Sequence, residues 1–468
     1  MLRGYIMEFQ RSAETNLIAW LNQSNRKPMV LRGARQVGKT WLVRTVAKLC
    51  NKRLIELNLE RRPELINLFS DNDPKSTLIR IEAFFNQSII LEESILFLDE
   101  IQAAPQLLSK LRWFAEELPQ LAVIAAGSLL EFVLSDHVFS MPVGRINYYH
   151  LEPLTFEEFL IAQGEHKLYE FISQYTFDTQ FPEIIHDKVM HLVKTFVLIG
   201  GMPMVVAEWI THPSLPKINQ MHHDLLASYR DDFAKYSGKI PLERLEELLN
   251  SVPRLLGEKF KYSKINSEVQ SSSLKKALNL LIKARLCHQV LACDGGGVPL
   301  GVNIKERTFK IILLDVGLVS ALLGLAVNYI DLKDILQLNN QGGLAEQLVG
   351  QLLRTGEPYY VDPQLYYWIR EKKGSLAEVD YLIQHGDKVV PIEVKAGKTG
   401  TLKSLHIFMS KNKLKMAVRI NGDCPSLTPV SHQLYSHEKV EYTLLSVPFY
   451  LTGQLHRLLS WVESGAVV

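Results

Sequence analysis

The stretch "RKPMVLRGARQVGKTWLVRTVAKLC", residues 26–50, decides how the first part of the chain folds. Residues 28–31 form a short apolar run that predicts a strand, and residues 33–40 follow as G-x-x-x-x-G-K-T. Apolar residues then recur at helical spacing. A loop of this kind between a strand and a helix turns its main-chain N–H groups toward phosphate oxygens, and the helix dipole adds positive potential. The stretch therefore predicts a phosphate-binding loop at the edge of a sheet.

The side chains of this loop divide the work of holding a nucleotide. Lys39 is placed for the β- and γ-phosphates of ATP, and the hydroxyl of Thr40 is placed for Mg²⁺. The residues that we expect to contact the nucleotide are Gly33, Ala34, Arg35, Gln36, Val37, Gly38, Lys39, Thr40 and Trp41.

Two further apolar runs predict strands that end in polar residues. "SILFLDEIQ", residues 94–102, carries Asp99 and Glu100 at its end; Asp99 is expected to hold Mg²⁺, and Glu100 to orient and deprotonate the attacking water. "LAVIAAGS", residues 121–128, ends in Ser128, a polar group that could sense the γ-phosphate. A helix is expected next, over residues 129–138. Alternating strands and helices predict an α/β fold with a parallel, helix-covered sheet.

These motifs, in this order, resemble those of the AAA+ ATPases. The resemblance implies a P-loop ATPase core over residues 1–154, with ATP and Mg²⁺ as cofactors. Arg145 follows the helix where that superfamily carries an arginine finger, which reaches the active site of a neighbouring subunit; a homo-oligomer is therefore implied. A surface ion pair is the alternative role for Arg145.

Residues 155–237 read as helical and have the size and place of the small lid that follows an AAA+ core. Arg230 is a weak candidate for a second sensor arginine in this part.

Residues 238–327 predict helices followed by two strands that pair across a glycine-rich turn, the pattern of a winged helix. The last helix begins at a serine cap near residue 271. Basic residues of this part that could lie along DNA phosphates are Lys275, Lys276, Lys283 and Arg285. Packing between domains is the alternative use of a winged helix.

Residues 328–468 predict a helix, starting near residue 342, and three strands joined by tight turns. Glu346 lies near the start of the helix, Asp380 opens the second strand, "DYLI", and Glu393 and Lys395 lie on the third. This arrangement resembles the PD-(D/E)xK nuclease fold. The resemblance implies that Asp380 and Glu393 bind Mg²⁺, that Glu346 completes its outer shell, and that Lys395 acts on the attacking water. The alternatives are a module that only binds, and a plain Glu393–Lys395 salt bridge.

Composition narrows the remaining function classes. The chain has 468 residues, a net charge of +2 and four cysteines without disulfide or metal spacing, which is typical of a reducing cytoplasm. No apolar run approaches the roughly 20 residues of a membrane span, so no membrane is expected as partner. Residues 395–419 contain seven Lys or Arg and no Asp or Glu, which favours contact with a polyanion such as DNA, or a solvated face.

Taken over residues 12–450, motifs such as "GGMP", "LLDVGL", "LAEQLVGQ" and "PIEVKAGK" resemble a large prokaryotic group of AAA+ ATPases fused to a C-terminal domain of unknown function. The leading hypothesis is a Mg²⁺-dependent ATPase that couples its nucleotide state to binding or cutting of nucleic acid. The alternatives are an ATP-operated switch whose C-terminal modules only bind DNA or protein, and a partner-recruiting ATPase that uses no nucleic acid.

Overall fold

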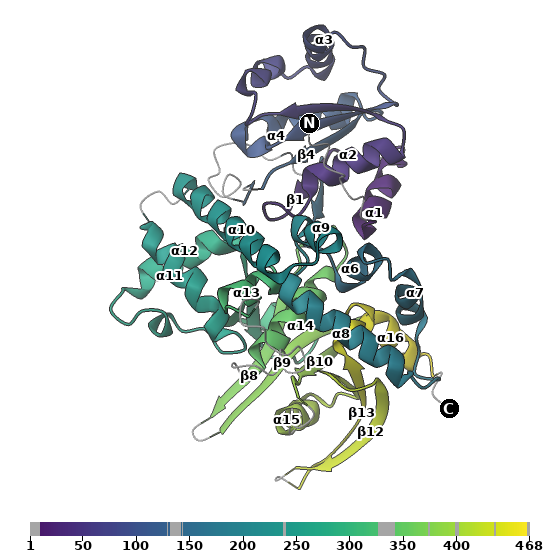
Figure 1. Cartoon of the computed structure of the whole chain (residues 1–468), viewed down its shortest axis with the longest axis vertical. Coiled ribbons are helices and arrows are strands. Elements are labelled where there is room, and N and C mark those ends of the chain that lie inside the picture. The colour runs from purple at the N-terminus through teal and green to yellow at the C-terminus, as the bar shows by residue number, and fades with distance from the viewer. Residues whose placement is uncertain are drawn as a thin grey trace. The chain divides into compact units, whose positions relative to one another are not determined.

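The chain divides into two compact units in the computed structural model (Figure 1), which describes residues 10–128, 130–131, 142, 144–236, 240–325, 342–372, 375–397, 402–434 and 437–465. The N-terminal unit comprises Met1–Pro153, Lys283–Arg285 and Glu357–Asp362, and the C-terminal unit comprises Leu154–Ile282, Leu286–Gly356 and Pro363–Val468. The domain limits predicted at residues 237 and 328 lie outside the described residues, and the division into four domains stays a prediction.

A parallel sheet of five strands forms the centre of the N-terminal unit, in the order β2-β3-β4-β1-β5. Its strands are β1 (Met29–Arg32), β2 (Arg53–Asn58), β3 (Ser94–Asp99), β4 (Ala122–Ala126) and β5 (Asn147–His150). Ala126 pairs with Leu31 on one side and with Asp99 on the other. The loops after β1, β3 and β4 therefore leave the sheet at the same edge, and the predicted α/β fold of this part is confirmed.

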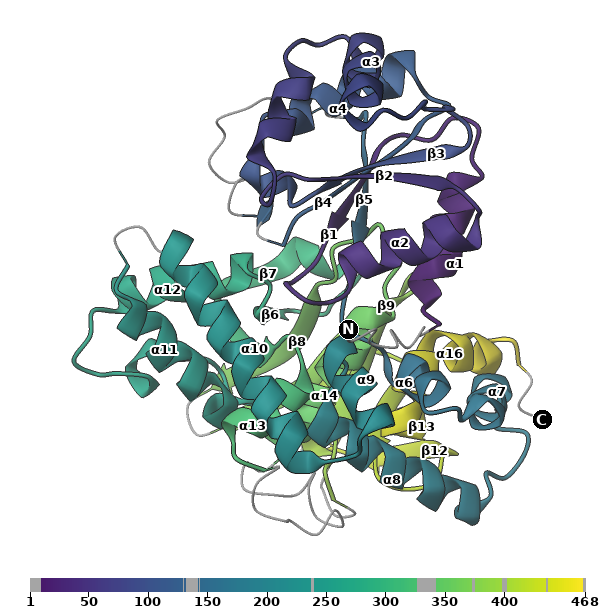
Figure 2. The same cartoon turned by 45° about the horizontal axis from the view of Figure 1, so that its top comes forward.

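Helices cover both faces of this sheet, with α1 and α2 on one side and α3 and α4 on the other (Figure 2). These helices are α1 (Ser12–Leu21), α2 (Lys39–Leu49), α3 (Pro74–Phe85) and α4 (Leu107–Glu117), and short 3-10 turns span Pro63–Phe69 and Ile101–Ala103. Leu108 and Leu111 on α4 pack with strand residues such as Leu96 into a buried apolar cluster. The helix expected over residues 129–138 lies outside the described residues except at its first turn.

The C-terminal unit starts with helices. They are α6 (Phe156–Ala162), α7 (His166–Gln174), α8 (Glu183–Ile199), α9 (Pro203–Thr211), α10 (Leu215–Tyr236), α11 (Leu242–Ser251), α12 (Ser271–Lys283) and α13 (Val316–Leu322), with 3-10 turns at Val252–Leu255 and Tyr262–Lys264. The start of α6 shows why the chain turns helical after residue 154. The Thr155 hydroxyl accepts a hydrogen bond from the Glu158 N–H at 3.0 Å, and the Glu158 carboxylate accepts one from the Thr155 N–H at 3.1 Å.

An eight-stranded mixed sheet completes the C-terminal unit, in the order β12-β13-β11-β10-β9-β8-β6-β7. Its strands are β6 (Cys287–Cys293), β7 (Ile304–Leu313), β8 (Leu365–Lys372), β9 (Ser375–His385), β10 (Lys388–Val394), β11 (Met416–Asn421), β12 (Ser426–Gln433) and β13 (Lys439–Pro448). The remaining elements of this unit are α14 (Gly343–Thr355), α15 (Lys403–Asn412), α16 (Leu455–Glu463) and 3-10 turns at Leu300–Asn303 and Phe449–Gln454.

The hairpin expected in the winged helix does form, but it is part of this larger sheet. β6 pairs with β7 in antiparallel fashion, and Val290–Ala292 of β6 also pair in parallel with Leu365–Tyr367 of β8. The free edge that a separate wing would show on β6 is therefore used by β8. The sequence pattern could not reveal this, because hairpin periodicity is local and the partner strand lies far downstream. The winged-helix and nuclease-like assignments remain predictions.

A buried network of hydrogen bonds joins the motifs "GGMP", "LLDVGL" and "LAEQLVGQ" inside this unit. Asp315 accepts hydrogen bonds from the Gly201 N–H at 2.6 Å, the Gly317 N–H at 2.9 Å and the Gln351 side chain at 3.0 Å. Gln351 accepts one from the Val316 N–H at 2.7 Å, and Gln347 both donates to and accepts from Leu313 at 2.8 Å. These motif residues thus satisfy main-chain groups that have no access to water.

Candidate functional site

The loop between β1 and α2 has the backbone that a phosphate-binding loop requires. Gly38 has φ of 97° and Gln36 has φ of 65°, so the chain reverses twice before α2 begins at Lys39. A Cβ atom on Gly33 would lie 2.3 Å from the Leu151 carbonyl oxygen, so a side chain does not fit there. The loop lies at the carboxyl edge of β1, as the sequence predicts.

Lys39 is buried in this loop, although it is a cation. Its side chain is 8% exposed, and its Nζ donates to the carbonyl oxygens of Gly33 at 3.0 Å and Ala34 at 2.8 Å. Burial lowers the pKa of Lys39 to about 8, against the opposing influence of Glu100 and Asp99. Main-chain carbonyls compensate a buried ammonium only in part, so Lys39 is suited to receive the phosphates of a nucleotide.

The predicted magnesium ligands lie together. The Thr40 hydroxyl is 3.2 Å from both carboxylate oxygens of Asp99, and the Asn58 side chain donates to Asp99 at 3.1 Å. Burial raises the pKa of Asp99 to about 6, and the neighbouring Glu100 adds to the rise. A carboxylate and a hydroxyl in this arrangement fit Mg²⁺ bound with ATP. The sequence analysis did not identify Asn58 as part of this site. Its position as a polar residue at the end of the stretch that forms β2 could have indicated it.

Glu100 and Ser128 occupy the same edge of the sheet. Glu100 has φ of 54°, and its carboxylate accepts a hydrogen bond from the Gln102 amide at 2.5 Å. Ser128 follows β4, is buried, and its hydroxyl has no hydrogen-bond partner in the described part of the chain. A Cβ on Gly127 would lie 2.3 Å from the Gln102 side-chain oxygen, so Gln102 reaches the loop that carries Ser128. Gln102 is a second residue that the sequence reading did not single out.

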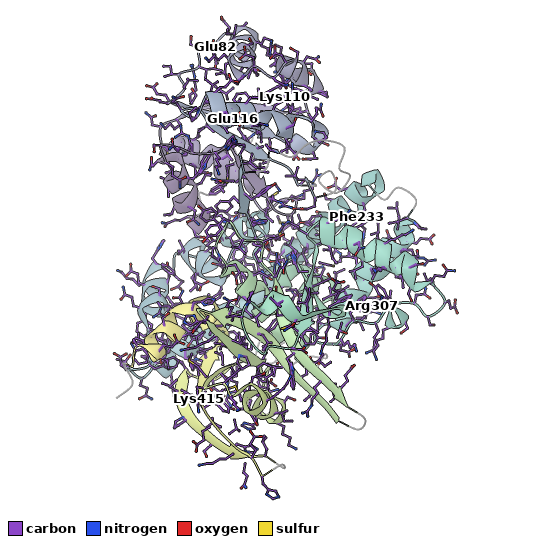
Figure 3. All side chains as sticks on the ribbon, turned by 180° about the vertical axis from the view of Figure 1, so that it is seen from behind. Glu82, Lys110, Glu116, Phe233, Arg307 and Lys415 are labelled. Carbon is purple, nitrogen blue, oxygen red and sulfur yellow. The ribbon has the colours of Figure 1, made fainter. Side chains whose placement is uncertain are left out.

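Arg145 lies on the surface of the N-terminal unit. Its guanidinium is half-exposed and donates a hydrogen bond to the Glu116 carboxylate on α4 at 2.7 Å. Figure 3 labels Glu116. Arg112 contacts the same carboxylate at 3.0 Å. Within one chain, Arg145 thus makes the surface ion pair that was the alternative to an arginine finger. Its role in a neighbouring subunit's site stays a prediction.

Arg285 does not lie on an exposed basic face, contrary to the expectation that groups it with Lys275 and Lys276. Its side chain is 7% exposed and contacts Glu131 at 3.3 Å and Asp362 at 3.1 Å within the N-terminal unit. Lys275 and Lys276 are exposed on α12. A φ of 58° directly before β6 turns Arg285 inward. The prediction for Arg285 was wrong because it rested on a cluster of basic residues in the sequence. Such a cluster does not indicate where the backbone turns and buries one of its members.

The four residues of the nuclease-like motif lie close together in the C-terminal unit. The Lys395 ammonium donates to Glu393 at 2.6 Å, and the Asp380 carboxylate accepts the Val394 N–H at 2.8 Å. Glu346 lies in the first turn of α14, and the Tyr381 hydroxyl donates to its carbonyl oxygen at 2.8 Å. The helix and the three strands form as predicted, with two differences in their limits. β9 begins at Ser375, so Asp380 lies within that strand and does not open it, and β10 ends at Val394, one residue before Lys395.

The structure adds two residues to this cluster that the sequence analysis did not name, Lys310, which lies between the acids, and a further acid, Glu378. Lys310 on β7 donates to Glu346 at 2.8 Å, pairs with Glu378, and lies 3.6 Å from Asp380. Its side chain is 2% exposed. A lone lysine in the apolar run "FKIILL" was the signal that could have found it.

Burial perturbs the titration of this cluster. Burial raises the pKa of Glu346 to about 7, although Lys310 opposes the rise. Burial and the nearby Asp380 raise the pKa of Glu393 to about 8. The second carboxylate oxygen of Glu393 has no hydrogen-bond partner among the described residues.

The acids of this cluster do not fit a divalent metal as they lie. Within the described ranges, no group of three His, Cys, Asp or Glu residues is arranged to hold a metal ion. Lys310 takes part of the space between Glu346 and Asp380, and Lys395 engages Glu393. The geometry therefore offers a resident ammonium where the nuclease resemblance implies Mg²⁺.

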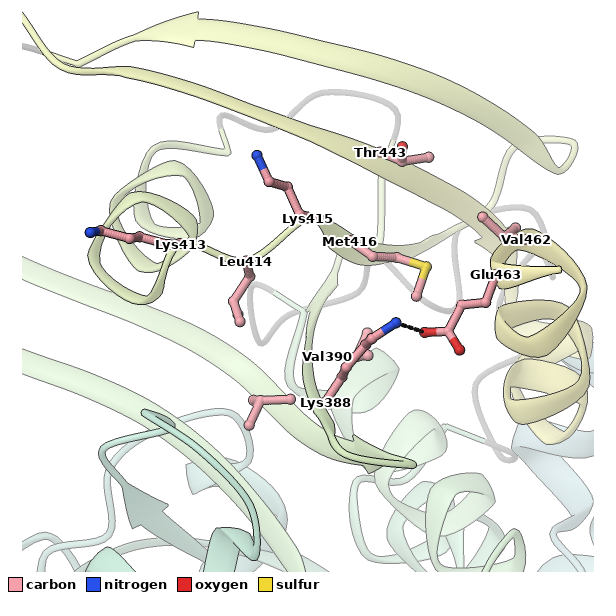
Figure 4. A pocket seen from close by; sticks show the side chains of 10 residues that line it. Lys388, Val390, Lys413, Leu414, Lys415, Met416, Thr443, Val462 and Glu463 are labelled. Atoms are coloured by element: carbon pink, nitrogen blue, oxygen red, sulfur yellow. Dashed lines mark hydrogen bonds and ion pairs between the residues drawn. The ribbon is translucent and has the colours of Figure 1, made fainter. Parts of the chain in front are cut away.

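A pocket of about 380 Å³ opens elsewhere in the C-terminal unit (Figure 4). Lys388, Lys413 and Lys415 line it, with apolar contributions from Leu414 and Met416. Lys388 pairs with Glu463 of α16 at 2.9 Å. The pocket is therefore lined by three lysines and one glutamate together with apolar side chains.

Among the described helices, none is long and apolar enough to cross a membrane.

Three family models match successive parts of the chain. Residues 25–160 match an AAA domain, and residues 190–328 and 341–426 match two domains of unknown function. A comparison with curated proteins gave no match.

Solved structures with a similar arrangement include a Walker-type ATPase of Pyrococcus abyssi, at 17% identity and a TM-score of 0.43, covering 67% of this chain and 96% of that one. The Thermotoga maritima RuvB Holliday junction branch migration motor shows 15% identity and a TM-score of 0.28, covering 64% of this chain and 93% of that one. The family match covers the P-loop described above, and residues 25–160 are therefore the part of the chain that is similar to an AAA domain.

Proposed function

We propose that the chain is a Mg²⁺-dependent ATPase whose nucleotide state controls binding of nucleic acid by its C-terminal unit. The observation that carries the ATPase part is the buried Lys39 in the loop after β1, next to the Thr40–Asp99 pair. A buried ammonium held only by carbonyls is stabilised further by an anion, and the loop N–H groups add donors for phosphate.

The residues at this edge have separate roles in hydrolysis. Mg²⁺, held by Thr40 and Asp99, would neutralise charge on the β- and γ-phosphates. Glu100 accepts the proton of the attacking water. Ser128, whose hydroxyl has no hydrogen-bond partner among the described residues, offers that hydroxyl to the γ-phosphate. Because Gln102 already binds the Glu100 carboxylate, it helps to orient that base.

Release of inorganic phosphate from ATP by the purified chain tests this part directly. We expect turnover with Mg²⁺ and none with EDTA. A protein that binds ATP but never hydrolyses it, alone or with DNA, contradicts the ATPase proposal.

Exposed lysines support the nucleic-acid part. Lys403, Lys411, Lys413 and Lys415 lie exposed on α15 and on the segment between α15 and β11, and the last two line the basic pocket. Figure 3 shows Lys415 at the surface of the unit. Such a group of cations on one local segment binds phosphates through release of counterions.

Fluorescence anisotropy with a labelled DNA duplex tests the nucleic-acid part. We expect the double variant Lys413→Ala/Lys415→Ala to bind more weakly and to lower the slope of log K against log salt by about 2. Lys167→Ala/Lys188→Ala removes the same charge from α7 and α8, where both lysines are paired with glutamates, and serves as the control. Equal loss in both variants contradicts a specific surface.

Two functions stand open for the nuclease-like part, cleavage and binding alone. The position of Lys310, which donates to Glu346 and lies 3.6 Å from Asp380, favours binding alone, because the nuclease resemblance assigns both carboxylates to the metal site. Hydrolysis shared between subunits of a homo-oligomer, through Arg145, and a cytoplasmic location belong to the same proposal.

A further inference from the structure

Lys310 is a buried lysine on β7, the edge strand of the eight-stranded sheet. It lies on β7 between Phe309 and Ile311, and all three are buried. Removing an ammonium from water costs several kcal/mol unless partners compensate it. A lysine at such a place therefore has a specific electrostatic use.

Its partners are all carboxylates, and they come from different elements. Glu346 comes from α14, and Glu378 and Asp380 come from β9. The ammonium also lies 5.2 Å from the centre of the Tyr367 ring, on β8, where a cation–π contact adds stabilisation. The cation thus receives contacts from one helix, α14, and from two strands, β8 and β9, that are not adjacent to its own strand in the sheet.

The position of the ammonium excludes a divalent ion from the same space. Mg²⁺ and Mn²⁺ bind carboxylate oxygens at about 2.0–2.2 Å and require several oxygens at once. Here the ammonium is 2.8 Å from Glu346 and 3.6 Å from Asp380. The other Asp380 oxygen is taken by the Val394 N–H, and one Glu393 oxygen by Lys395.

We propose that Lys310 is the resident cation of this cluster and takes the place of the divalent metal that the nuclease resemblance implies. The C-terminal unit then keeps the fold without metal and does not cleave phosphodiesters. This inference deepens the binding-only form of the proposed function. Its test uses metal ions alone, so it can fail while ATP hydrolysis and DNA binding stand.

Titration calorimetry of Mn²⁺ into the full, nucleotide-free chain is the first measurement. Binding at this cluster is measured as the saturable heat that is present in the wild type and absent from Asp380→Asn. Weak binding of Mn²⁺ near Asp99 is unaffected by that substitution, so it cancels in the comparison. We expect no such heat from the wild-type chain at millimolar Mn²⁺. One equivalent of Mn²⁺ bound in an Asp380-dependent way by the wild type overturns the proposal.

Lys310→Met is the second measurement, since methionine keeps the length of the side chain and removes its charge. Without metal we expect its melting temperature to fall by about 10 °C, because three carboxylates lose their counter-ion. With millimolar Mn²⁺ we expect a saturable, Asp380-dependent site and recovery of at least half of that loss. Lys305→Met, on the same strand but exposed and paired with Asp294, is the control and should do neither.

A folded Lys310→Met that gains no Mn²⁺ binding contradicts the proposal, because the lysine then does not hold a metal's place. If Lys310→Met does not fold in EDTA, refolding in millimolar Mn²⁺ is followed by circular dichroism. Metal-dependent recovery supports the proposal, and folding that Mn²⁺ fails to restore contradicts it.

Discussion

The Asp315 carboxylate accepts a 2.6 Å hydrogen bond from the main-chain N–H of Gly201, which lies 114 residues earlier in the chain. The same carboxylate is so close to Gly200 that a Cβ there would lie 1.9 Å from its oxygen. Gly200 ends α8 with φ of 74°. Asp315 of "LLDVGL" therefore explains why "GGMP" begins with two glycines: it leaves no room for a side chain at Gly200 and binds the N–H of Gly201.

Gly200→Ala should destabilise the C-terminal unit strongly. The new methyl group collides with Asp315, and a positive φ disfavours alanine as well, so we expect a loss of about 3–4 kcal/mol in the free energy of unfolding. Gly164→Ala is the matched control: Gly164 has φ of 77° and nothing within 4 Å of its Cβ position. Urea unfolding should show a loss of only about 1 kcal/mol in the free energy of unfolding for this control. Equal losses would mean that the collision with Asp315 is relieved at no cost.

Lys39→Ala and Glu100→Gln should separate nucleotide binding from hydrolysis. The first variant loses the cation of the loop, so we expect no ATP binding by calorimetry. The second keeps binding and loses turnover, because an amide does not accept the proton of water. Glu117→Gln, exposed on α4, is the control for the second change. Wild-type turnover in Glu100→Gln would remove Glu100 as the base.

Arg145→Ala tests whether a neighbouring subunit completes the site. If Arg145 acts in trans, specific ATPase activity rises with protein concentration, and the variant loses roughly 10³-fold in turnover with little change in ATP affinity. Arg112→Ala is the control, since Arg112 binds the same Glu116 carboxylate. Similar activity in both variants, independent of concentration, leaves only the surface ion pair.

The buried His222 predicts a loss of stability in mild acid. Burial lowers the pKa of His222 from 6.5 to about 4, and its Nε2 lies 2.9 Å from the Ile199 carbonyl oxygen. Because the folded pKa is depressed, the neutral ring stabilises the fold fully above pH 6.5, and this contribution disappears as the pH falls toward 4.

The expected loss from His222 is about 3 kcal/mol over that interval. In His222→Gln the amide can still donate to Ile199, so the acid-dependent part of the loss should be absent from urea unfolding at a series of pH values. His191→Gln, exposed on α8, should keep the wild-type pH dependence. An unchanged pH dependence in His222→Gln would assign the loss to other groups.

The features that the sequence predicted correctly are those with a local signal. The loop from Gly33 to Thr40, the strands that end at Asp99 and near Ser128, and the helix that carries Glu346 each follow from a short stretch of residues. In each case a strand, a turn or a helix start fixes the place of the side chain.

The features that it missed depend on strands or turns that meet only in three dimensions. The partners of Lys310, Glu346 and Glu378, lie on other elements of the fold. The sequence around Lys310 shows one charge in an apolar strand, but it does not indicate which acids pair with that charge. Arg285 was placed with exposed lysines because only its charge was considered, whereas the turn before β6 buries it.

The pairing of β6 with β8 also limits where the chain can be divided. A fragment that starts at residue 328 would lack β6 and β7, so the edge of β8 that pairs with Val290–Ala292 would be open to another chain. The same cut would leave Glu346, Glu378 and Asp380 without Lys310. A cut between the two C-terminal parts would therefore leave an unpaired strand edge on each half, and the half that carries Glu346 and Asp380 would also keep surplus negative charge.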